Sequence, residues 1–378
     1  MKTFVLSLLI AIPLCLVFED LQAEPVLLGK SSSPYPTGYT TQRHIFHVNG
    51  RWFVFFHVGS KRHEDRKIVY VHSEDGKSFS DPVVVAEGVA QIFHVIERGG
   101  KIHLTCVDPN QWTLFYSQGS AKDGKISFSD RVTVHHTGIS FAVQAPYCEL
   151  DSEGKPWISW RWQDTETKAY HVYVSVARDQ VGASWKDPVD ITDLSLSRVG
   201  AGACSSILFR LESDKMAVLY CTDKAKLGFS LFSDDKWTQS RLDVDYAGTH
   251  DLSAVMDIAG TIHAVFRAQG GAMMYMQYAK DAWSEPVKID GPAHIHSLSL
   301  GMDSKGGLYA FLARPGGVRV SRRIDGSWQP TKMIAKDAFS PYFWTATSVG
   351  APAVAVVWCE GEGPWKEPFE IRLAVLNP

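Results

Sequence analysis

The sequence predicts an all-β fold, a seven-bladed β-propeller of four-stranded antiparallel blades, and three observations support this prediction. Seven segments share a tight turn followed by an apolar strand, and each is followed by at least one further strand. Apolar and polar residues alternate along these segments, with many aromatic and β-branched residues and no convincing amphipathic helix. Evenly spaced short strands with regular turns are typical of a propeller.

The repeat is clearest where the turn reads Asp-x-x-Gly. Three segments have this turn: DSEGKPWISWRW (151–162), DIAGTIHAVFRA (257–268) and DSKGGLYAFLAR (303–314). Four more have a shorter or altered turn: VNGRWFVFFH (48–57), RGGKIHLTCVD (98–108), LESDKMAVLYC (211–221) and SVGAPAVAVVW (348–358). A spacing of roughly 45–60 residues suits one four-stranded unit per repeat.

The seventh unit ends the chain after only three strands, the last being EIRLAVL (370–376). The segment EPVLLGK (24–30) can supply the missing fourth strand and close the ring. Closure removes free sheet edges, which promote aggregation. We therefore predict one propeller domain over residues 24–378.

The first 23 residues are predicted to be a cleavable signal peptide. Lys2 is followed by an apolar run from Phe4 to Phe18, and Leu21-Gln22-Ala23 forms a small-residue cleavage signal. No later stretch approaches the ~20 apolar residues of a spanning helix. The mature chain is expected to be secreted or periplasmic, without a membrane span.

The composition of the chain limits the classes of ligand and partner that we expect. The formal net charge of −3 gives no basic stripe for nucleic acid. No metal-binding motif is evident, so we expect no metal and no cofactor, and we expect a monomer. The mature chain holds five cysteines, too few and too odd for a disulfide framework. Cys204 with Cys221 is the likeliest bridge, but buried free thiols are favoured.

Polar residues recur at one end of the otherwise apolar strands. In a propeller, the innermost strand begins and the second strand ends on the same face, around the mouth of the central channel. Aligning the repeats predicts a ligand site there, with these residues on its rim: Gln42, Gln91, Gln144, His250, Asp251, His296, His57, Arg161, Arg267, Asp108, Arg314 and Tyr342. Arginine offers a planar fork suited to carboxylate, sulfate or phosphate. Solvated strand ends are the alternative explanation.

Two segments resemble a known repeat. The residues from Ser73 to Phe79, and Asp325-Gly326-Ser327-Trp328, are similar to degenerate Asp-boxes of the sialidase (BNR-repeat) superfamily. The resemblance implies a propeller. It also implies a sialidase-like glycosidase, in which Arg43 with Arg161, Arg267 or Arg314 would clamp a carboxylate, Asp65 would be the acid and Tyr342 the nucleophile. Arg43 is followed by His-Ile in place of the family's Ile-Pro.

The predicted architecture is also similar to seven-bladed polysaccharide lyases. β-Elimination needs a cation to neutralise a uronate carboxylate, a base for the α-proton and an acid for the leaving oxygen. In this interpretation Arg161 and Arg267 bind the carboxylate, His250 or His296 is the base, and Tyr342 is the acid.

A rim of arginine, histidine, tyrosine and glutamine fits a lyase better than a hydrolase that needs two carboxyl groups. We therefore predict an exported protein acting on acidic oligo- or polysaccharides, with lyase chemistry ahead of sialidase-type hydrolysis. A non-catalytic carbohydrate-binding propeller is the third alternative.

Overall fold

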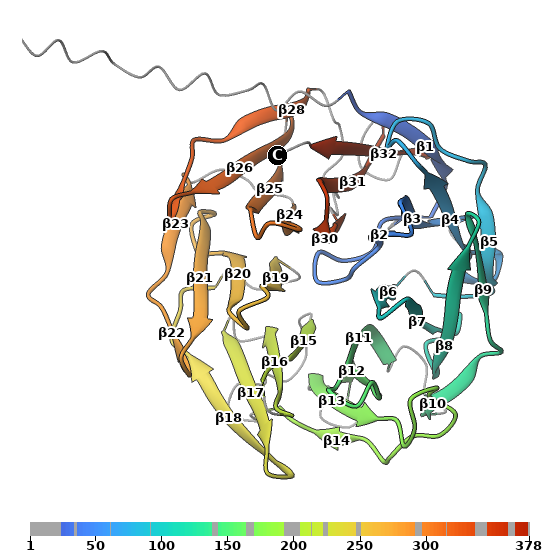
Figure 1. Cartoon of the computed structure of the whole chain (residues 1–378), viewed down its shortest axis with the longest axis horizontal. Helices are drawn as coiled ribbons and strands as arrows, with labels where there is room; N and C mark the ends of the chain where they lie inside the picture. Colours follow the sequence, from blue (N-terminus) through green and yellow to red (C-terminus); the bar gives the residue numbers. More distant parts are fainter. Residues whose placement is uncertain are drawn as a thin grey trace, which may run out of the picture.

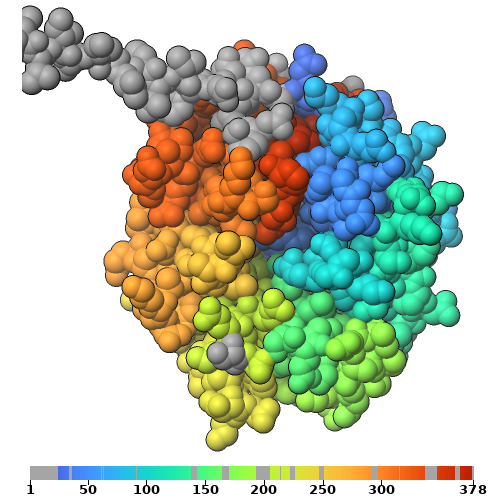
Figure 2. Space-filling model, in the orientation of Figure 1, coloured from blue at the N-terminus to red at the C-terminus, as the bar shows by residue number. Residues whose placement is uncertain are grey.

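The computed structural model describes residues 24–33, 36–60, 62–90, 92–137, 143–163, 170–192, 205–212, 214–221, 226–246, 251–291, 297–314, 316–336, 346–361 and 367–376. These residues form seven antiparallel sheets arranged as the blades of a ring (Figure 1). The chain passes round the ring in order, from blue to red, and the space-filling view shows the blades around a central hollow (Figure 2). The predicted seven-bladed propeller is therefore confirmed.

In blades one to four, the strands follow one another along the chain from the channel outward. Blade one is β2 (Ile45–Val48), β3 (Arg51–Val58), β4 (Lys67–Ser73) and β5 (Val83–Glu87). Blade two is β6 (Phe93–Arg98), β7 (Lys101–Val107), β8 (Thr113–Lys122) and β10 (Val132–His136), with β9 (Lys125–Phe128) also paired antiparallel to β8. Blade three is β11 (Val143–Leu150), β12 (Pro156–Gln163), β13 (Tyr170–Val176) and β14 (Val189–Asp190). Blade four is β15 (Ser206–Arg210), β16 (Met216–Cys221), β17 (Leu227–Ser233) and β18 (Lys236–Leu242).

The remaining three blades follow the same plan. Blade five is β19 (Leu252–Met256), β20 (Ile262–Arg267) and β21 (Met273–Ala279), with β22 (Ala282–Trp283) and β23 (Val287–Asp290) both paired to β21; blade six is β24 (Ser297–Asp303), β25 (Leu308–Arg314) and β26 (Gly317–Ile324), with β27 (Ser327–Trp328) and β28 (Lys332–Lys336) paired to β26; blade seven is β29 (Ala346–Thr347), β31 (Val354–Glu360), β32 (Phe369–Leu376) and β1 (Val26–Ser31). The short β30 (Val349–Ala351) pairs in parallel with β24.

The N-terminal strand lies beside the C-terminal one. β1 pairs antiparallel with β32, from Val26 opposite Leu373 to Ser31 opposite Phe369. It is the outermost strand of blade seven, whose other strands come from the end of the chain.

The Asp-x-x-Gly turns owe their recurrence to the aspartate side chain. In blade five, Asp257 Oδ1 accepts hydrogen bonds from the backbone N–H groups of Ala259 and Thr261, both at 2.9 Å. Gly260 adopts a positive φ of 78°, which glycine reaches without a side-chain clash. The carboxylates of Asp151 and Asp303 make the same two contacts in blades three and six. Each turn is thus stabilised by residues of the turn itself, which explains why the Asp-x-x-Gly motif marks a hairpin in the sequence.

Hydrophobic clusters fill the spaces between and within blades. The largest joins blades three, four and five through fully buried residues such as Ile207, Leu219 and Phe266. No α-helix occurs in the described ranges, and one 3-10 turn spans His63–Asp65. Four cysteines, Cys106, Cys148, Cys221 and Cys359, are buried thiols without a disulfide. The bridge predicted as the alternative for Cys221 involves Cys204, which lies outside the described residues.

Candidate functional site

The candidate site is built where innermost strands begin and second strands end in blades three, four and five. In blade three, Arg161 of β12 lies opposite Gln144 of β11. In blade five, the backbone N–H of Arg267 donates to the carbonyl of Asp251 at 3.2 Å. The two arginines therefore occupy equivalent rim positions.

A β-bulge sets the pairing in blade three. The register of β11 shifts between Gln144 and Tyr147, and Ala145 between them has a φ of 50°. A bulge adds one residue to one strand and re-aims the side chains beyond it. As a result, Gln144 corresponds to Asp251 in blade five, one residue later than counting back from the hairpin glycine predicts.

Arg161 is a buried cation. Only 6% of the residue is exposed, and its guanidinium lies over the ring of Tyr170 at 4.6 Å. Its Nε has no hydrogen-bond partner, and no carboxylate among the described residues pairs with it. Burial of a charge that has no ion-pair partner in the described part of the chain costs on the order of several kcal/mol, which an anionic ligand would offset. Arg161 is therefore suited to receive an anion.

Arg267 is in a different electrostatic state. Its Nη2 lies 2.5 Å from Oδ2 of Asp251, whose side chain is 5% exposed. Burial raises the pKa of Asp251 to about 7, and the opposing effect of Arg267 is smaller. The charge of Arg267 is thus compensated above that pH and released below it.

Two buried groups, Cys221 and Tyr246, lie among these charges. The hydroxyl of Tyr246 and the thiol of Cys221 are hydrogen-bonded, and burial raises both pKa values. Arg161 and Asp251 act electrostatically on Cys221, while Asp251 and Arg267 act on Tyr246. The pair therefore lies within electrostatic range of both arginines, with Arg161 acting on the thiol and Arg267 on the phenol. No sequence pattern points to Tyr246, which precedes blade five outside the repeat.

The charge of Arg314 is also compensated by an aspartate. At the end of β25, its Nη1 lies 3.4 Å from Oδ2 of Asp290, on the outer part of blade five. It contributes to a contact between blades five and six.

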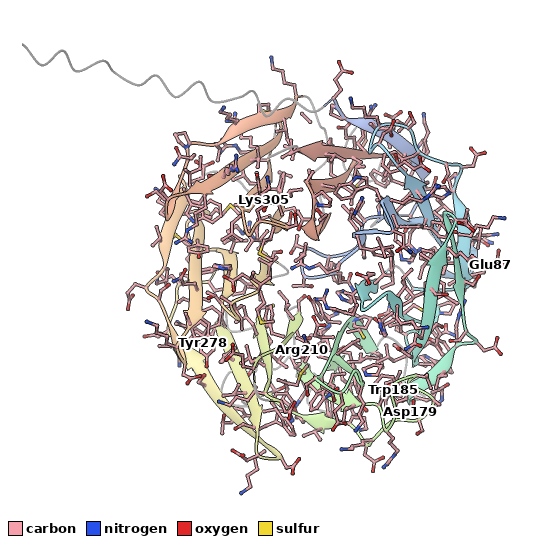
Figure 3. The ribbon with its side chains drawn as sticks, in the orientation of Figure 1. Glu87, Asp179, Trp185, Arg210, Tyr278 and Lys305 are labelled. Atoms are coloured by element: carbon pink, nitrogen blue, oxygen red, sulfur yellow. The ribbon has the colours of Figure 1, made fainter. Side chains whose placement is uncertain are left out.

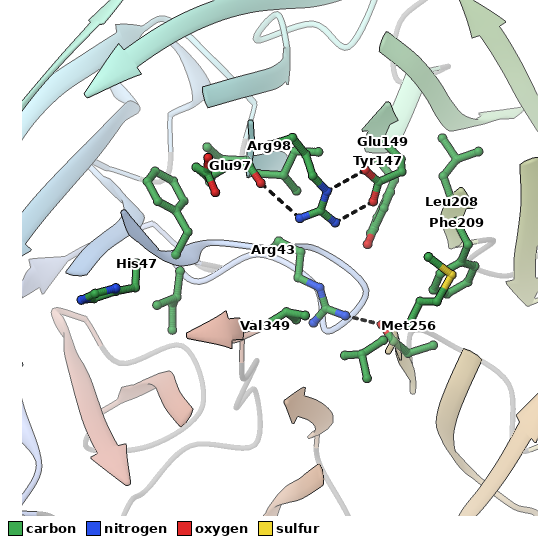
Figure 4. A pocket seen from close by; sticks show the side chains of 17 residues that line it. Arg43, His47, Glu97, Arg98, Tyr147, Glu149, Leu208, Phe209, Met256 and Val349 are labelled. Atoms are coloured by element: carbon green, nitrogen blue, oxygen red, sulfur yellow. Dashed lines mark hydrogen bonds and ion pairs between the residues drawn. The ribbon is translucent and has the colours of Figure 1, made fainter. Parts of the chain in front are cut away.

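The segment 36–44 runs into the central channel (Figures 1 and 4). The Nη1 of Arg43 donates to Leu300 O and to Thr347 Oγ1, both at 3.4 Å, and its Nη2 donates to Ala254 O. Arg43 thereby ties blades five, six and seven together from inside. Its guanidinium lies at a small cavity of the channel and not on the rim (Figure 4).

Gln42 belongs to the same inserted segment. It is 1% exposed, and its Nε2 donates at 3.3 Å to the carbonyl of Pro146, in the bulge of blade three. Its Oε1 accepts from the backbone N–H of Tyr39. These bonds hold the segment in the channel.

Three other predicted site residues lie in blades one and two, away from Arg161 of blade three and Arg267 of blade five. His57 is fully buried in blade one, edge-on to Phe93 at 4.8 Å. Asp108 accepts from the backbone N–H of Trp112 at 2.7 Å, which stabilises a turn in blade two. Asp65 accepts from the hydroxyl of Ser60 at 2.8 Å in an exposed loop. Their predicted roles with a ligand stay predictions.

The predicted catalytic residues His250, His296 and Tyr342, together with Gln91, lie outside the described residues. Within the described ranges, no group of three or more histidine, cysteine, aspartate or glutamate side chains is arranged to hold a metal ion. Nor does any helix in these ranges have the length and apolar character to cross a membrane.

No known protein family and no curated protein sequence matches this chain. Among solved structures, it is similar to a PL25 ulvan lyase bound to a GlcA(1-4)Rha3S saccharide, with 13% identity and a TM-score of 0.57 over 94% of this chain and 96% of that chain. It is similar to the polysaccharide lyase Uly1, with 10% identity and a TM-score of 0.56 over 94% and 100%.

A NanB sialidase variant from Streptococcus pneumoniae has 14% identity and a TM-score of 0.50 over 93% of this chain and 70% of that chain. At such identities the likeness concerns the fold. The chain is thus a seven-bladed β-propeller with the fold of polysaccharide lyases and sialidases. The architecture implied by the sequence resemblance is confirmed.

Proposed function

We propose that this protein is an exported carbohydrate-active enzyme that cleaves acidic glycans by lyase-type β-elimination. The observation that carries the proposal is Arg161, a buried guanidinium without a carboxylate partner among the described residues. A uronate carboxylate would supply the missing negative charge. Binding there would also withdraw electron density from the carboxylate and acidify the α-proton.

The second arginine contributes less positive charge, because Asp251 compensates Arg267. It extends the site along the rim towards blade five. A ligand that reaches both arginines lies across blade four, over the buried pair of Tyr246 and Cys221. The site is therefore elongated, as a polymer substrate requires.

The proton-transfer groups are assigned from the sequence. His250 directly precedes Asp251, and His296 directly precedes β24, so either is proposed as the base that removes the α-proton. Tyr342 is proposed to protonate the leaving oxygen. The fold shared with a PL25 ulvan lyase bound to a uronate-containing saccharide supports this reaction class.

The hydrolase alternative is weaker for a local reason. A sialidase-like clamp needs Arg43 at the ligand, whereas its guanidinium is bonded to Leu300, Thr347 and Ala254 in the channel. Asp65, the acid of that alternative, is bonded to Ser60. Export rests on the predicted signal peptide at residues 1–23, with a secreted or periplasmic location and an acidic oligo- or polysaccharide as partner.

The test is turnover of ulvan, alginate and sialosides by the purified protein, with both kinds of product measured. We expect the ultraviolet absorbance of an unsaturated uronate, lost in Arg161→Ala and kept in Arg241→Ala, a matched change on the outer strand β18. Release of free sialic acid would establish the hydrolase instead. Binding without turnover, unchanged in His250→Ala and His296→Ala, would establish a lectin.

A further inference from the structure

A groove between blades three and four lies at the opposite end of the strands from Arg161. Its floor comes from β12 and from the hairpin that joins β17 and β18, and it encloses about 520 Å³. This volume is within the roughly 300–1,000 Å³ of small-molecule sites. Trp157 of this groove and Arg161 are four residues apart on β12, or about 13 Å along an extended strand. The groove is therefore separate from the candidate active site.

Three aromatic rings form the floor. Trp157 contacts Phe232 at 5.0 Å and Trp237 at 6.2 Å between ring centroids, and Phe232 contacts Trp237 at 5.3 Å. The indole N–H of Trp157 is satisfied by Asp151 Oδ2 at 3.0 Å. The rings are thus held in place by one another and by one hydrogen bond.

Trp237 differs from the tryptophans at the equivalent hairpin position in blades five and six. Trp283 and Trp328 have their indole nitrogens buried. All three tryptophans are partly exposed, but the indole nitrogen of Trp237 is not buried as those of Trp283 and Trp328 are, and it makes no hydrogen bond within the described residues. A free donor on an apolar ring is what a polar ligand with an apolar face can use.

The walls carry charges of both signs, namely Lys155, Arg178 and Lys186 against Asp151, Asp187 and Asp235. Three cations and three anions leave no net charge to attract a polyanion such as nucleic acid. The interspersed charges also make poor walls for an apolar helix or strand. They do suit hydroxyl groups, which donate to carboxylates and accept from ammonium and guanidinium groups.

A second groove continues the surface. It encloses about 650 Å³ between blades two and three, shares Asp151 with the first groove, and is lined by Lys101, Gln180 and Arg210. Figure 3 places Arg210 towards the centre of the ring, with Asp179 and Trp185 at its periphery. The two grooves therefore form one continuous surface through Asp151.

We propose that the groove of Trp157, Phe232 and Trp237 is a second, non-catalytic binding site for a glycan chain. A pyranose ring stacks its C–H face on Trp237, and its hydroxyls bond to Lys186, Asp187 and Asp235. Recognition depends on stacking and hydroxyl contacts, so it is insensitive to salt, unlike an ion pair at Arg161.

The experiment uses the Arg161→Ala protein, which isolates the groove from the candidate active site. Retardation in native gels containing ulvan, xylan or mixed-linkage β-glucan is measured at low and high salt. We expect at least one polysaccharide to retard the protein equally at both salt concentrations, and Trp237→Ala to raise its dissociation constant at least tenfold. Trp283→Ala, at the equivalent position in blade five, is the matched control and keeps the retardation.

Thermal unfolding of each variant establishes that it is folded. If Trp237→Ala does not fold, the double variant Lys186→Ala/Asp187→Ala changes two exposed side chains and is expected to weaken retardation about threefold. The proposal is overturned if none of the three polysaccharides retards the protein, or if retardation persists in the groove variants. A concentration-dependent dimer that Trp237→Ala abolishes would assign the groove to a second copy of the chain, which also overturns it.

Discussion

Blades three and five place an arginine at the same rim position, yet the two arginines are in opposite electrostatic states. Arg161 is buried opposite Gln144, without a carboxylate partner among the described residues. Arg267 is paired with Asp251. The strand position is the same, so the difference comes from the residue across the hairpin. The site is therefore polarised, with its strongest attraction for anions at blade three.

The largest test of this difference is removal of each arginine in turn. Arg161→Ala should weaken binding of a uronate oligosaccharide by about thirtyfold or more, since losing one partner of a buried charged contact costs about 2–5 kcal/mol and each 1.4 kcal/mol is about tenfold. Arg267→Ala should weaken it only about tenfold, because Asp251 already compensates that charge. Isothermal titration of both variants measures the ratio, and equal losses would contradict the polarised site.

Changing the residue opposite each arginine should change how strongly that arginine attracts an anionic glycan. Gln144→Glu gives Arg161 a carboxylate of nearly the same shape, and should reduce affinity for the anionic glycan about tenfold. Asp251→Asn frees Arg267 and should raise affinity a few fold. Binding curves in low salt show both changes most clearly, since screening weakens them. An increase in affinity for Gln144→Glu would rule out the charge argument.

The pKa of Asp251 adds a pH dependence. Its folded pKa of about 7 is raised from 3.8, so the folded protein binds more protons than the unfolded chain between these values. Stability therefore falls as the pH rises from about 4 to 7, and the loss is complete above 7. Asp251→Asn should flatten this part of the curve of melting temperature against pH.

The same titration acts on binding. Below pH 7 the protonated Asp251 no longer compensates Arg267, so the affinity for an anionic glycan should increase as the pH falls towards 5. In Asp251→Asn the increase should be absent. An unchanged slope in that variant would assign the pH dependence to another group.

The smallest expected effect concerns the buried pair between the arginines. Tyr246→Phe removes one hydroxyl and its hydrogen bond to the thiol of Cys221, which keeps its contacts with the backbone of Ser205, at a cost of about 1 kcal/mol in the free energy of unfolding. Affinity for the glycan should not change, because Tyr246 is fully buried. Denaturant unfolding measures the first quantity and titration the second.

Much of the fold was predictable because its determinants are local. The Asp-x-x-Gly turn is made by one carboxylate and a glycine within a few residues, as Asp257 and Gly260 show. Its recurrence therefore marks each hairpin. The alignment of hairpins also placed Arg161 and Arg267 at equivalent positions correctly.

The rest depended on contacts that no local pattern encodes. The bulge at Ala145 changed which residue lies opposite Arg161. The insertion of residues 36–44 took Arg43 to partners 211 to 304 residues away. The pairing of Tyr246 with Cys221 joins the end of β16 to the connection that follows β18, 25 residues later in the sequence. Each of these required the spatial arrangement of several blades.

The inserted segment also bears on how the molecule is assembled. Residues 36–44 are among the first to be synthesised after the N-terminal strand, but the carbonyls that bind Arg43 belong to blades five and six, and a further acceptor, Thr347, to blade seven. The segment can therefore make these hydrogen bonds only after most of the chain has been synthesised. Contacts of such high sequence separation slow folding. The blades thus enclose a segment from near the N-terminus, and the contacts that hold this segment in the channel form only after the last blades have folded.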